Sequence, residues 1–275
     1  MVMSGLTRHT QLRNDDVTVI KFGGAAIQSA SAIDEIATAV GEGLTRGGHI
    51  VIVNGGGKEI DELCKRLSIE TAKAGGLRIT TPDVLEAVQM SLSKKSAEIA
   101  LSLMRLGITA IPLPAFSGGM VTCRRRERSN DGMDLGLVGQ IVSVNRKILD
   151  ALFDMNAVPV IYPLCADGSG TLYNVNADEV ASSVASALRA STLLLMTDVP
   201  GIIVNANVLK SIRYEDIRPL LASGDIRDGM LPKINAAGSA VMSGVERVCI
   251  MDGSRPDSLS AFFREGILNG TEIRV

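Results

Sequence analysis

Residues 19–24 read VIKFGG, a stretch in which an apolar strand pattern runs into a lysine and then two glycines. Residues 17–20 have the character of a buried strand. A lysine at the end of such a strand is costly unless its ammonium group meets a negative charge. Gly23 and Gly24 suit a tight turn or a close approach of the backbone to a ligand. The stretch therefore predicts an anion site at the end of a buried strand.

Strand and helix patterns alternate along the chain. Strands are expected at residues 17–20, 50–53, 108–113, 158–162, 192–196, 247–251 and 272–275. Helices are expected at residues 30–44, 59–67, 82–106, 147–155, 178–189, 214–221 and 231–243. This order predicts an α/β fold in which helices cover both faces of a mainly parallel central sheet. Ligands of such sheets bind beyond the carboxyl ends of the strands, which is where VIKFGG ends.

Two segments depart from the alternation. Residues 115–142 are rich in glycine, arginine and serine and are predicted to form β-hairpins, and residues 202–208 form a small excursion. We expect a polar arm at residues 1–16, an N-terminal lobe at residues 17–190 and a C-terminal lobe at residues 191–275. Both lobes are expected to share one sheet.

Composition limits the class of function. The chain has 275 residues, a net charge of −2, 3% aromatic residues and no tryptophan, so neither bulk charge nor base stacking favours nucleic-acid binding. With only two histidines, no zinc site or histidine-dependent catalytic triad is expected. The four cysteines form no CxxC pair, and no apolar run is long enough to span a membrane. These features predict a cytoplasmic protein with reduced cysteines.

A second glycine-rich stretch, VIVNGGGKEID, occupies residues 51–61. A strand pattern runs into three glycines, and a helix pattern follows. Successive bare N–H groups at the start of a helix form an anion cradle. The stretch matches neither a Walker A loop nor GxGxxG, so a dehydrogenase is disfavoured. Phosphate binding by Gly56 and Gly57 is the favoured interpretation, with Lys58 solvated.

Four further motifs lie near predicted strand or helix ends. Arg78, within GGLRIT, is suited either to clamping a carboxylate or to an ordinary salt bridge, and the sequence leaves both open. Asn174, Asn176 and Asp178 lead into a helix, where asparagines can orient a substrate and Asp178 can act as an N-cap. Thr197 and Asp198 end an apolar strand. Lys233 lies in the first turn of a helix, where a cation opposes the dipole, and the sequence alone leaves open a neighbouring anion or an ordinary surface lysine.

Together and in this order, these motifs resemble those of the amino-acid kinase family. The matching pieces are VIKFGG, VIVNGGG, GLRIT, VGQIVSVN, YNVNADEVA, LLLMTDVPGI, DGMLPKINAA and GTEIRV, which span nearly the whole chain. The resemblance implies a three-layer αβα sandwich, with acidic substrate bound by the N-terminal lobe and ATP by the C-terminal lobe. The most similar members phosphorylate the γ-carboxylate of N-acetyl-L-glutamate in arginine biosynthesis. Mg²⁺ would be carried by the nucleotide, without protein metal ligands.

The resemblance also implies roles for individual residues. Lys21 and Lys233 would stabilise the transferring phosphoryl group, and Asp178 would position both lysines. Backbone N–H groups of Gly23, Gly24, Gly56 and Gly57 would surround that phosphate. The acceptor would be held by Gly56, Gly57, Arg78, Asn174 and Asn176. The nucleotide would contact Thr197, Asp198, Val199, Gly201, Ile202, Asp225, Ile226, Arg227, Gly229 and Lys233.

Some positions depart from the family pattern and leave the acceptor open. Asn54 stands where a histidine is usual, Ala25 replaces a small polar residue, and residues 115–123 match poorly. An acetylaminoadipate kinase, or a kinase acting on carrier-linked aminoadipate or glutamate, is an alternative. The cationic run CRRRER at residues 123–128 would suit an acidic carrier protein but is more typical of a solvated hairpin. A non-catalytic sensor of amino acid or nucleotide is another alternative, disfavoured by the presence of Lys21, Asp178 and Lys233.

The N-terminal segment bears on assembly. Arginine-inhibited members of the family carry an N-terminal helix with apolar and aromatic residues that joins dimers into hexamers. Residues 1–16 show no such pattern. The sequence therefore predicts a homodimer that arginine does not inhibit.

Overall fold

The computed structural model describes residues 16–129, 131–222, 230–255 and 257–274. Its central element is an eight-stranded sheet in which neighbouring strands follow the order β14-β16-β15-β11-β1-β2-β8-β5. These strands are β14 (Ser211–Arg213), β16 (Gly270–Arg274), β15 (Arg247–Asp252), β11 (Thr192–Thr197), β1 (Val17–Phe22), β2 (His49–Asn54), β8 (Val158–Tyr162) and β5 (Ala110–Pro114). The pairings from β15 to β5 are all parallel, as predicted.

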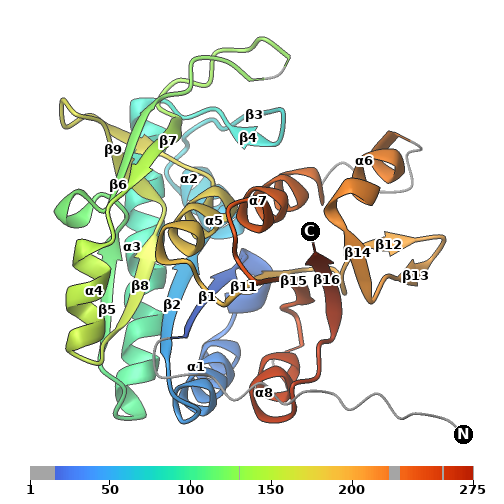
Figure 1. Cartoon of the computed structure of the whole chain (residues 1–275). Coiled ribbons are helices and arrows are strands. Elements are labelled where there is room, and N and C mark those ends of the chain that lie inside the picture. Colours follow the sequence, from blue (N-terminus) through green and yellow to red (C-terminus); the bar gives the residue numbers. More distant parts are fainter. Residues whose placement is uncertain (1–15, 130, 223–229, 256, 275) are drawn as a thin grey trace, which may run out of the picture.

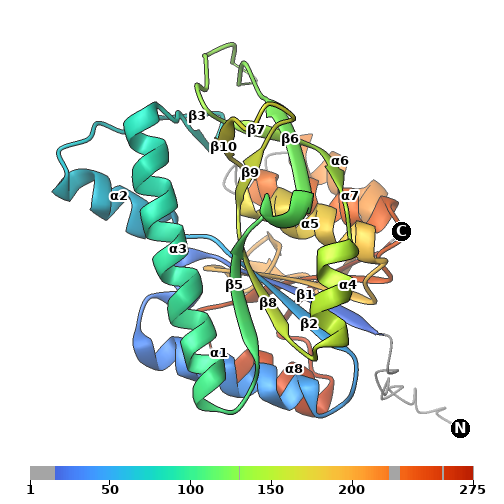
Figure 2. The ribbon, with the colours of Figure 1, turned by 90° about the vertical axis from the view of Figure 1, so that its left-hand side faces the viewer.

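Helices cover both faces of this sheet, which gives the predicted three-layer αβα sandwich (Figures 1 and 2). One face carries α1 (Ala30–Leu44), α3 (Pro82–Arg105) and α8 (Asp257–Glu265), and the other carries α4 (Lys147–Asp154), α5 (Ala177–Leu188) and α7 (Leu231–Met242). Each layer has its own apolar core. Helices α2 (Gly57–Arg66) and α6 (Tyr214–Ala222) complete the set that the structure describes.

A second sheet lies beside the main one, above α5 in Figure 2. It has the order β10-β9-β6-β7, with β10 (Leu172–Asn174), β9 (Leu164–Ala166), β6 (Val121–Arg125) and β7 (Gly139–Val144). The pair β6–β7 is antiparallel, which confirms the predicted hairpin. Short hairpins β3–β4 (Lys73–Ala74, Leu77–Arg78) and β12–β13 (Ile203–Val204, Asn207–Val208) also form. Short 3₁₀ turns occupy Gly24–Ile27 (η1) and Ser117–Gly119 (η2).

The main differences from the expected order lie in the C-terminal part. Helix α8 was not expected, although Leu259, Phe262 and Phe263 follow one another at helical spacing and are buried. Strand β16 runs antiparallel to β15, because the short segment between α8 and β16 brings the chain back along β15 in the opposite direction. Strands of two or three residues, such as β3 and β14, were too short to show a periodicity.

The long helix α3 begins as the sequence predicts. The Thr81 hydroxyl accepts a hydrogen bond from the Val84 N–H, and Pro82 occupies the first turn. The four cysteines are buried and form no disulfide. In the described part of the chain, no helix combines the length and apolar character needed to cross a bilayer.

The alternation of side chains along β1 determines the face of the sheet toward which Lys21 points. Ile20 and Phe22 belong to the core beneath α1, whereas Val17 and Val19 belong to the core beneath α5. Because successive side chains of a strand point to opposite faces, Lys21 points with Val19 toward the α5 layer. The lysine of VIKFGG therefore enters the layer in which Asp178 begins a helix.

Candidate active site

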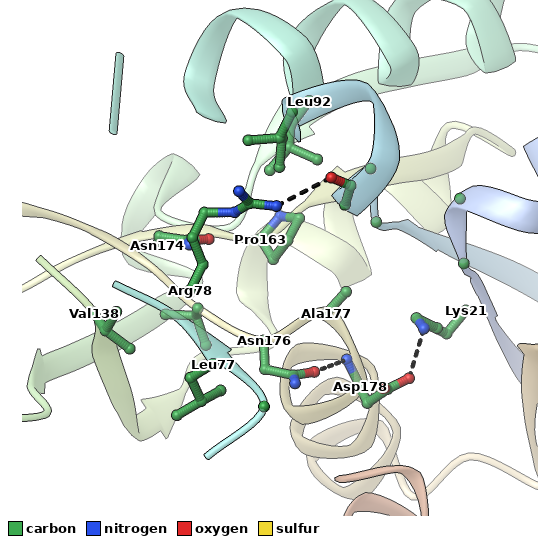
Figure 3. Close-up of a pocket in the computed structure, with 18 of the residues that line it drawn as sticks. Lys21, Leu77, Arg78, Leu92, Val138, Pro163, Asn174, Asn176, Ala177 and Asp178 are labelled. Carbon is green, nitrogen blue, oxygen red and sulfur yellow. Dashed lines mark hydrogen bonds and ion pairs between the residues drawn. The ribbon is translucent and has the colours of Figure 1, made fainter. Parts of the chain in front are cut away.

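The buried charge of Lys21 meets a carboxylate. Lys21 Nζ lies 2.7 Å from Asp178 Oδ1, and each side chain is only 7% exposed (Figure 3). An opposite charge at this distance offsets part of the cost of removing the ammonium group from water. The structure thus brings together two residues that stand 157 positions apart in the sequence, the strand-end lysine and the helix-start aspartate.

Helix α5 holds the aspartate by its own N-terminus. Asn176 caps the helix, and its Oδ1 accepts a hydrogen bond of 2.7 Å from the Asp178 N–H. The N-cap is therefore Asn176, and Asp178 lies in the first turn. A negative side chain there is favoured by the helix dipole. The carboxylate of Asp178 thus remains available to pair with Lys21.

The two glycine stretches lie next to this pair. Gly55 N–H donates to Phe22 O at 2.8 Å, so the glycine loop after β2 lies next to the end of β1. A Cβ on Gly23 would lie 3.7 Å from Lys21 Nζ, and one on Gly24 would lie 3.2 Å from Glu59 Oε2. A Cβ on Gly56 would lie 2.9 Å from Leu92 Cδ2. These bare backbones next to Lys21 and the start of α2 have the character of a phosphate cradle.

Arg78 approaches from the β3–β4 hairpin and is 6% exposed. Its Nη2 donates to Gly57 O at 3.0 Å, and its Nη1 pairs with Asp61. Burial favours a higher pKa for the Asp61 carboxyl, but Arg78 and Lys73 outweigh it and hold that pKa below its usual range. Sequence reasoning missed Asp61, although it lies on α2 four residues after Gly57. Arg78 thus forms a salt bridge within the chain, and its guanidinium retains further donors.

These groups surround a cavity of about 250 Å³. Nine of the predicted residues line it: Lys21, Gly23, Gly24, Gly56, Gly57, Arg78, Asn174, Asn176 and Asp178. Asn174 is held by a hydrogen bond of 3.2 Å from its Nδ2 to Thr80 Oγ1. Apolar residues that the sequence did not single out, among them Leu92 and Pro163, complete the wall. Such a cavity, with Lys21, Lys73 and Arg78 in its wall, fits a small acidic molecule.

Lys233 lies in an adjoining, larger cavity of about 930 Å³ between the β6–β7 hairpin and helices α5 and α7. The two cavities share Gly76, Leu77, Asn176 and Asp178 in their walls. Asp178 therefore faces Lys21 on one side and the cavity of Lys233 on the other. Among the residues that the structure describes, no ion pair joins Lys233 to a carboxylate.

The cationic run at residues 123–128, which begins on β6 and continues past its end, is partly neutralised within the chain. Arg126 pairs with Glu179 at 2.9 Å, and Arg125 pairs with Asp134 at 2.9 Å. Burial raises the pKa of the Glu179 carboxyl above its ordinary value, against the opposing effect of Arg126. The segment therefore presents less free positive charge than its sequence indicates.

The expected nucleotide residues divide into two groups. Thr197, Asp198, Val199, Gly201 and Ile202 lie at or after the end of β11, the neighbour of β1, and line neither cavity. Ile202 is fully buried, and its N–H donates to Thr271 Oγ1 at 2.9 Å. Its carbonyl oxygen accepts a hydrogen bond of 2.9 Å from the Leu209 N–H, so both of its backbone groups are paired within the chain. Asp225, Ile226, Arg227 and Gly229 lie outside the described residues.

Comparison with known proteins agrees with this geometry. The amino acid kinase family model matches residues 16–252. The chain belongs to the amino acid kinase family. It is 36% identical to the acetylglutamate kinase of Archaeoglobus fulgidus over 262 residues, covering 90% of both chains. It is 37% identical to that of Methylobacterium nodulans, covering 91% of this chain and 86% of the relative.

A solved structure has the same fold. The carbamate kinase of Giardia lamblia bound to AMP-PNP superposes with a TM-score of 0.71 at 16% identity, covering 94% of this chain and 98% of that one. The expected fold class of this amino acid kinase is therefore confirmed.

Gly56 and Gly57 form a matched pair for testing how closely the glycine loop of this amino acid kinase packs against its neighbours. Leu92, which a Cβ on Gly56 would meet at 2.9 Å, is fully buried in a cluster with Ile60, Val84 and Val88. Gly56→Ala is expected to lower the free energy of unfolding by about 1–3 kcal/mol, measured by urea denaturation. Gly57→Ala, with no atom within 4 Å of the added Cβ, is expected to change it by less than about 0.5 kcal/mol. Equal effects of the two substitutions would contradict the close packing behind Gly56.

Proposed function

We propose that this chain is an ATP-dependent kinase that phosphorylates the γ-carboxylate of N-acetyl-L-glutamate to an acyl phosphate, as a cytoplasmic enzyme of arginine biosynthesis. The observation that carries the proposal is the buried Lys21–Asp178 pair, which lies between two glycine loops in the wall of a small polar cavity. Relatives named acetylglutamate kinase, which match 90% or more of the chain, support this acceptor.

Phosphoryl transfer between these two substrates requires positive charge more than it requires a base. An acceptor carboxylate is already ionised at pH 7, so no proton has to be removed. One of its oxygens forms a bond to the γ-phosphorus while the bond from that phosphorus to the bridging oxygen of ADP breaks, and ADP leaves. Two anions must therefore be brought together and held. Backbone donors and fixed cations that face the transferring group supply this stabilisation.

The proposal gives each described residue a role. Lys21 and Lys233 stabilise the charge on the transferring phosphoryl group from two sides, and Asp178 orients both lysines. The N–H groups of Gly23, Gly24, Gly56 and Gly57 hold the phosphate, and Arg78, Asn174 and Asn176 hold the acceptor. ATP lies along the carboxyl end of β11, at residues 197–202, and reaches Lys233. Mg²⁺ bound to the nucleotide supplies further neutralisation of phosphate charge. Asp225, Ile226, Arg227 and Gly229 remain predicted nucleotide contacts.

Two observations weaken the grounds for the alternative acceptors. Asn54, which replaces the usual histidine, is completely buried, donates to Leu92 O at 3.5 Å and does not line the cavity. The presence of Asn54 in place of the usual histidine therefore does not change which residues line the small cavity. The cationic run that would suit an acidic carrier protein has Arg125 and Arg126 already paired with carboxylates of the same chain.

The proposal predicts large losses of turnover in lysine variants. With ATP, Mg²⁺, N-acetylglutamate and hydroxylamine, the parent protein should form a hydroxamate. Lys21→Ala and Lys233→Ala should each lower kcat by about 10²–10³-fold, because each removes a cation at the transferring phosphate. Lys58→Ala is the control and should retain kcat, since Lys58 is exposed. Circular dichroism checks that each variant is folded.

The same assay with other acceptors distinguishes the proposed function from the alternative kinases and from a non-catalytic sensor. Hydroxamate from N-acetyl-2-aminoadipate but not from N-acetylglutamate would move the assignment to the aminoadipate kinases. Near-normal kcat in both lysine variants would refute the proposed mechanism. A parent protein that forms no hydroxamate with any of these acceptors would favour a sensor or a carrier-linked substrate.

We also infer a homodimer that arginine does not inhibit. Helix α3 exposes Met90, Leu101 and Met104, each at least half accessible, on an element that otherwise packs in the core. Covering such side chains in a second copy would remove apolar surface from water. Light scattering should give twice the chain mass of 29.0 kDa, and millimolar arginine should leave kcat unchanged. A hexamer, or inhibition by arginine, would overturn this inference.

A further inference from the structure

Helices α5 and α7 lie side by side on the same face of the main sheet (Figures 1 and 2). Among the described residues of the two helices, one side-chain hydrogen bond joins them, from Ser182 Oγ to the carbonyl oxygen of Ala236 at 2.8 Å. Ser182 is 3% exposed and Ala236 is 4% exposed, so water does not compete for the bond. The bond is a fixed point between two helices whose first turns carry the charged residues of the site.

The bond lies one turn below those charged residues on both helices. Ser182 follows Asp178 by four residues, and Ala236 follows Lys233 by three. Residues three or four apart lie on the same face of a helix. All four residues also line the larger cavity. The bond therefore sets the register between the turn that carries Asp178 and the turn that carries Lys233.

Ser186 shows the hydrogen bond that the Ser182 hydroxyl would make if it bonded within its own helix. Ser186, one turn further along α5, donates to Ser182 O at 2.8 Å within its own helix. This bond to the carbonyl four residues earlier is the usual arrangement of a serine inside a helix. Ser182 instead directs its hydroxyl across the interface to α7. The two serines therefore allow a comparison of an interhelical bond with an intrahelical one.

The first turn of α7 contains Pro232 and the buried core residue Ile234. Its N-cap residue, Met230, makes no side-chain capping bond. On another side of α7, a Cβ on Gly238 would lie 2.0 Å from Tyr214 Cε2, so the backbone packs directly on the Tyr214 ring. The Tyr214 contact limits how far α7 can shift in one direction, and the Ser182 bond fixes it against α5.

We propose that Ser182 is a positioning residue, which holds α7 in the register that directs Lys233 at the transferring phosphoryl group. This inference rests on the proposed kinase function. Ser182 itself touches no substrate atom in this account. It acts through Lys233, and its removal should affect the chemical step more than the binding of the acceptor.

Steady-state kinetics of serine variants tests the proposal. Ser182→Ala should lower kcat by about tenfold, because a small displacement of a charge-stabilising group is costly in the transition state. The KM for N-acetylglutamate should stay within about twofold of the parent value, since Lys233 does not line the smaller cavity. Ser186→Ala, which removes a hydroxyl from the same helix, should leave both constants unchanged. Alanine favours helix formation, so both variants are expected to fold.

A double-variant comparison separates positioning from a general structural effect. In a Lys233→Ala background, assayed at higher protein concentration, Ser182→Ala should cause no further loss of kcat, because the group it positions is absent. A further tenfold loss in that background, or unchanged kcat in Ser182→Ala alone, would overturn the inference while leaving the kinase function intact. An inactive parent protein would overturn the proposed function and this inference with it.

Discussion

The site depends on one buried ion pair, between Lys21 at the end of the central strand β1 and Asp178 in the first turn of α5. Neither charge is tolerable alone at this depth. Removing one partner of a buried pair typically costs about 3–5 kcal/mol, because the other charge is left without compensation. The pair therefore requires α5 to begin directly over the end of β1, and the positions of the surrounding loops follow from that requirement.

The parallel sheet explains why so many groups converge there. Strands β1, β2 and β11 are parallel neighbours, so their carboxyl ends meet at one edge. The end of β1 carries Lys21 and is followed by Gly23, the end of β2 is followed by Gly56, and β11 ends at Thr197. A site for two anionic substrates needs donors from several directions, and a single edge of a parallel sheet supplies them.

The sequence predicted what depends on local pattern. The helix at residues 30–44 and the strand at residues 158–162 form within the expected bounds, because hydrophobic period and flanking turns specify them. The pairing of Arg78 with Asp61 was not predictable, since the sequence left Arg78 open between substrate and salt bridge. The same holds for the Ser182–Ala236 bond, which depends on how two helices pack. Motif order located Lys21 and Asp178, but their 2.7 Å contact required the fold.

The most direct test of the central claim is ³¹P NMR of the protein with ATP, Mg²⁺ and N-acetylglutamate. An acyl-phosphate resonance should appear with the parent protein as the γ-phosphate resonance of ATP declines. The same resonance should be strongly reduced with folded Lys21→Met, in which Asp178 loses its partner and the transferring phosphate loses a cation. No acyl phosphate from the parent protein, or an equal rate from Lys21→Met, would contradict the account.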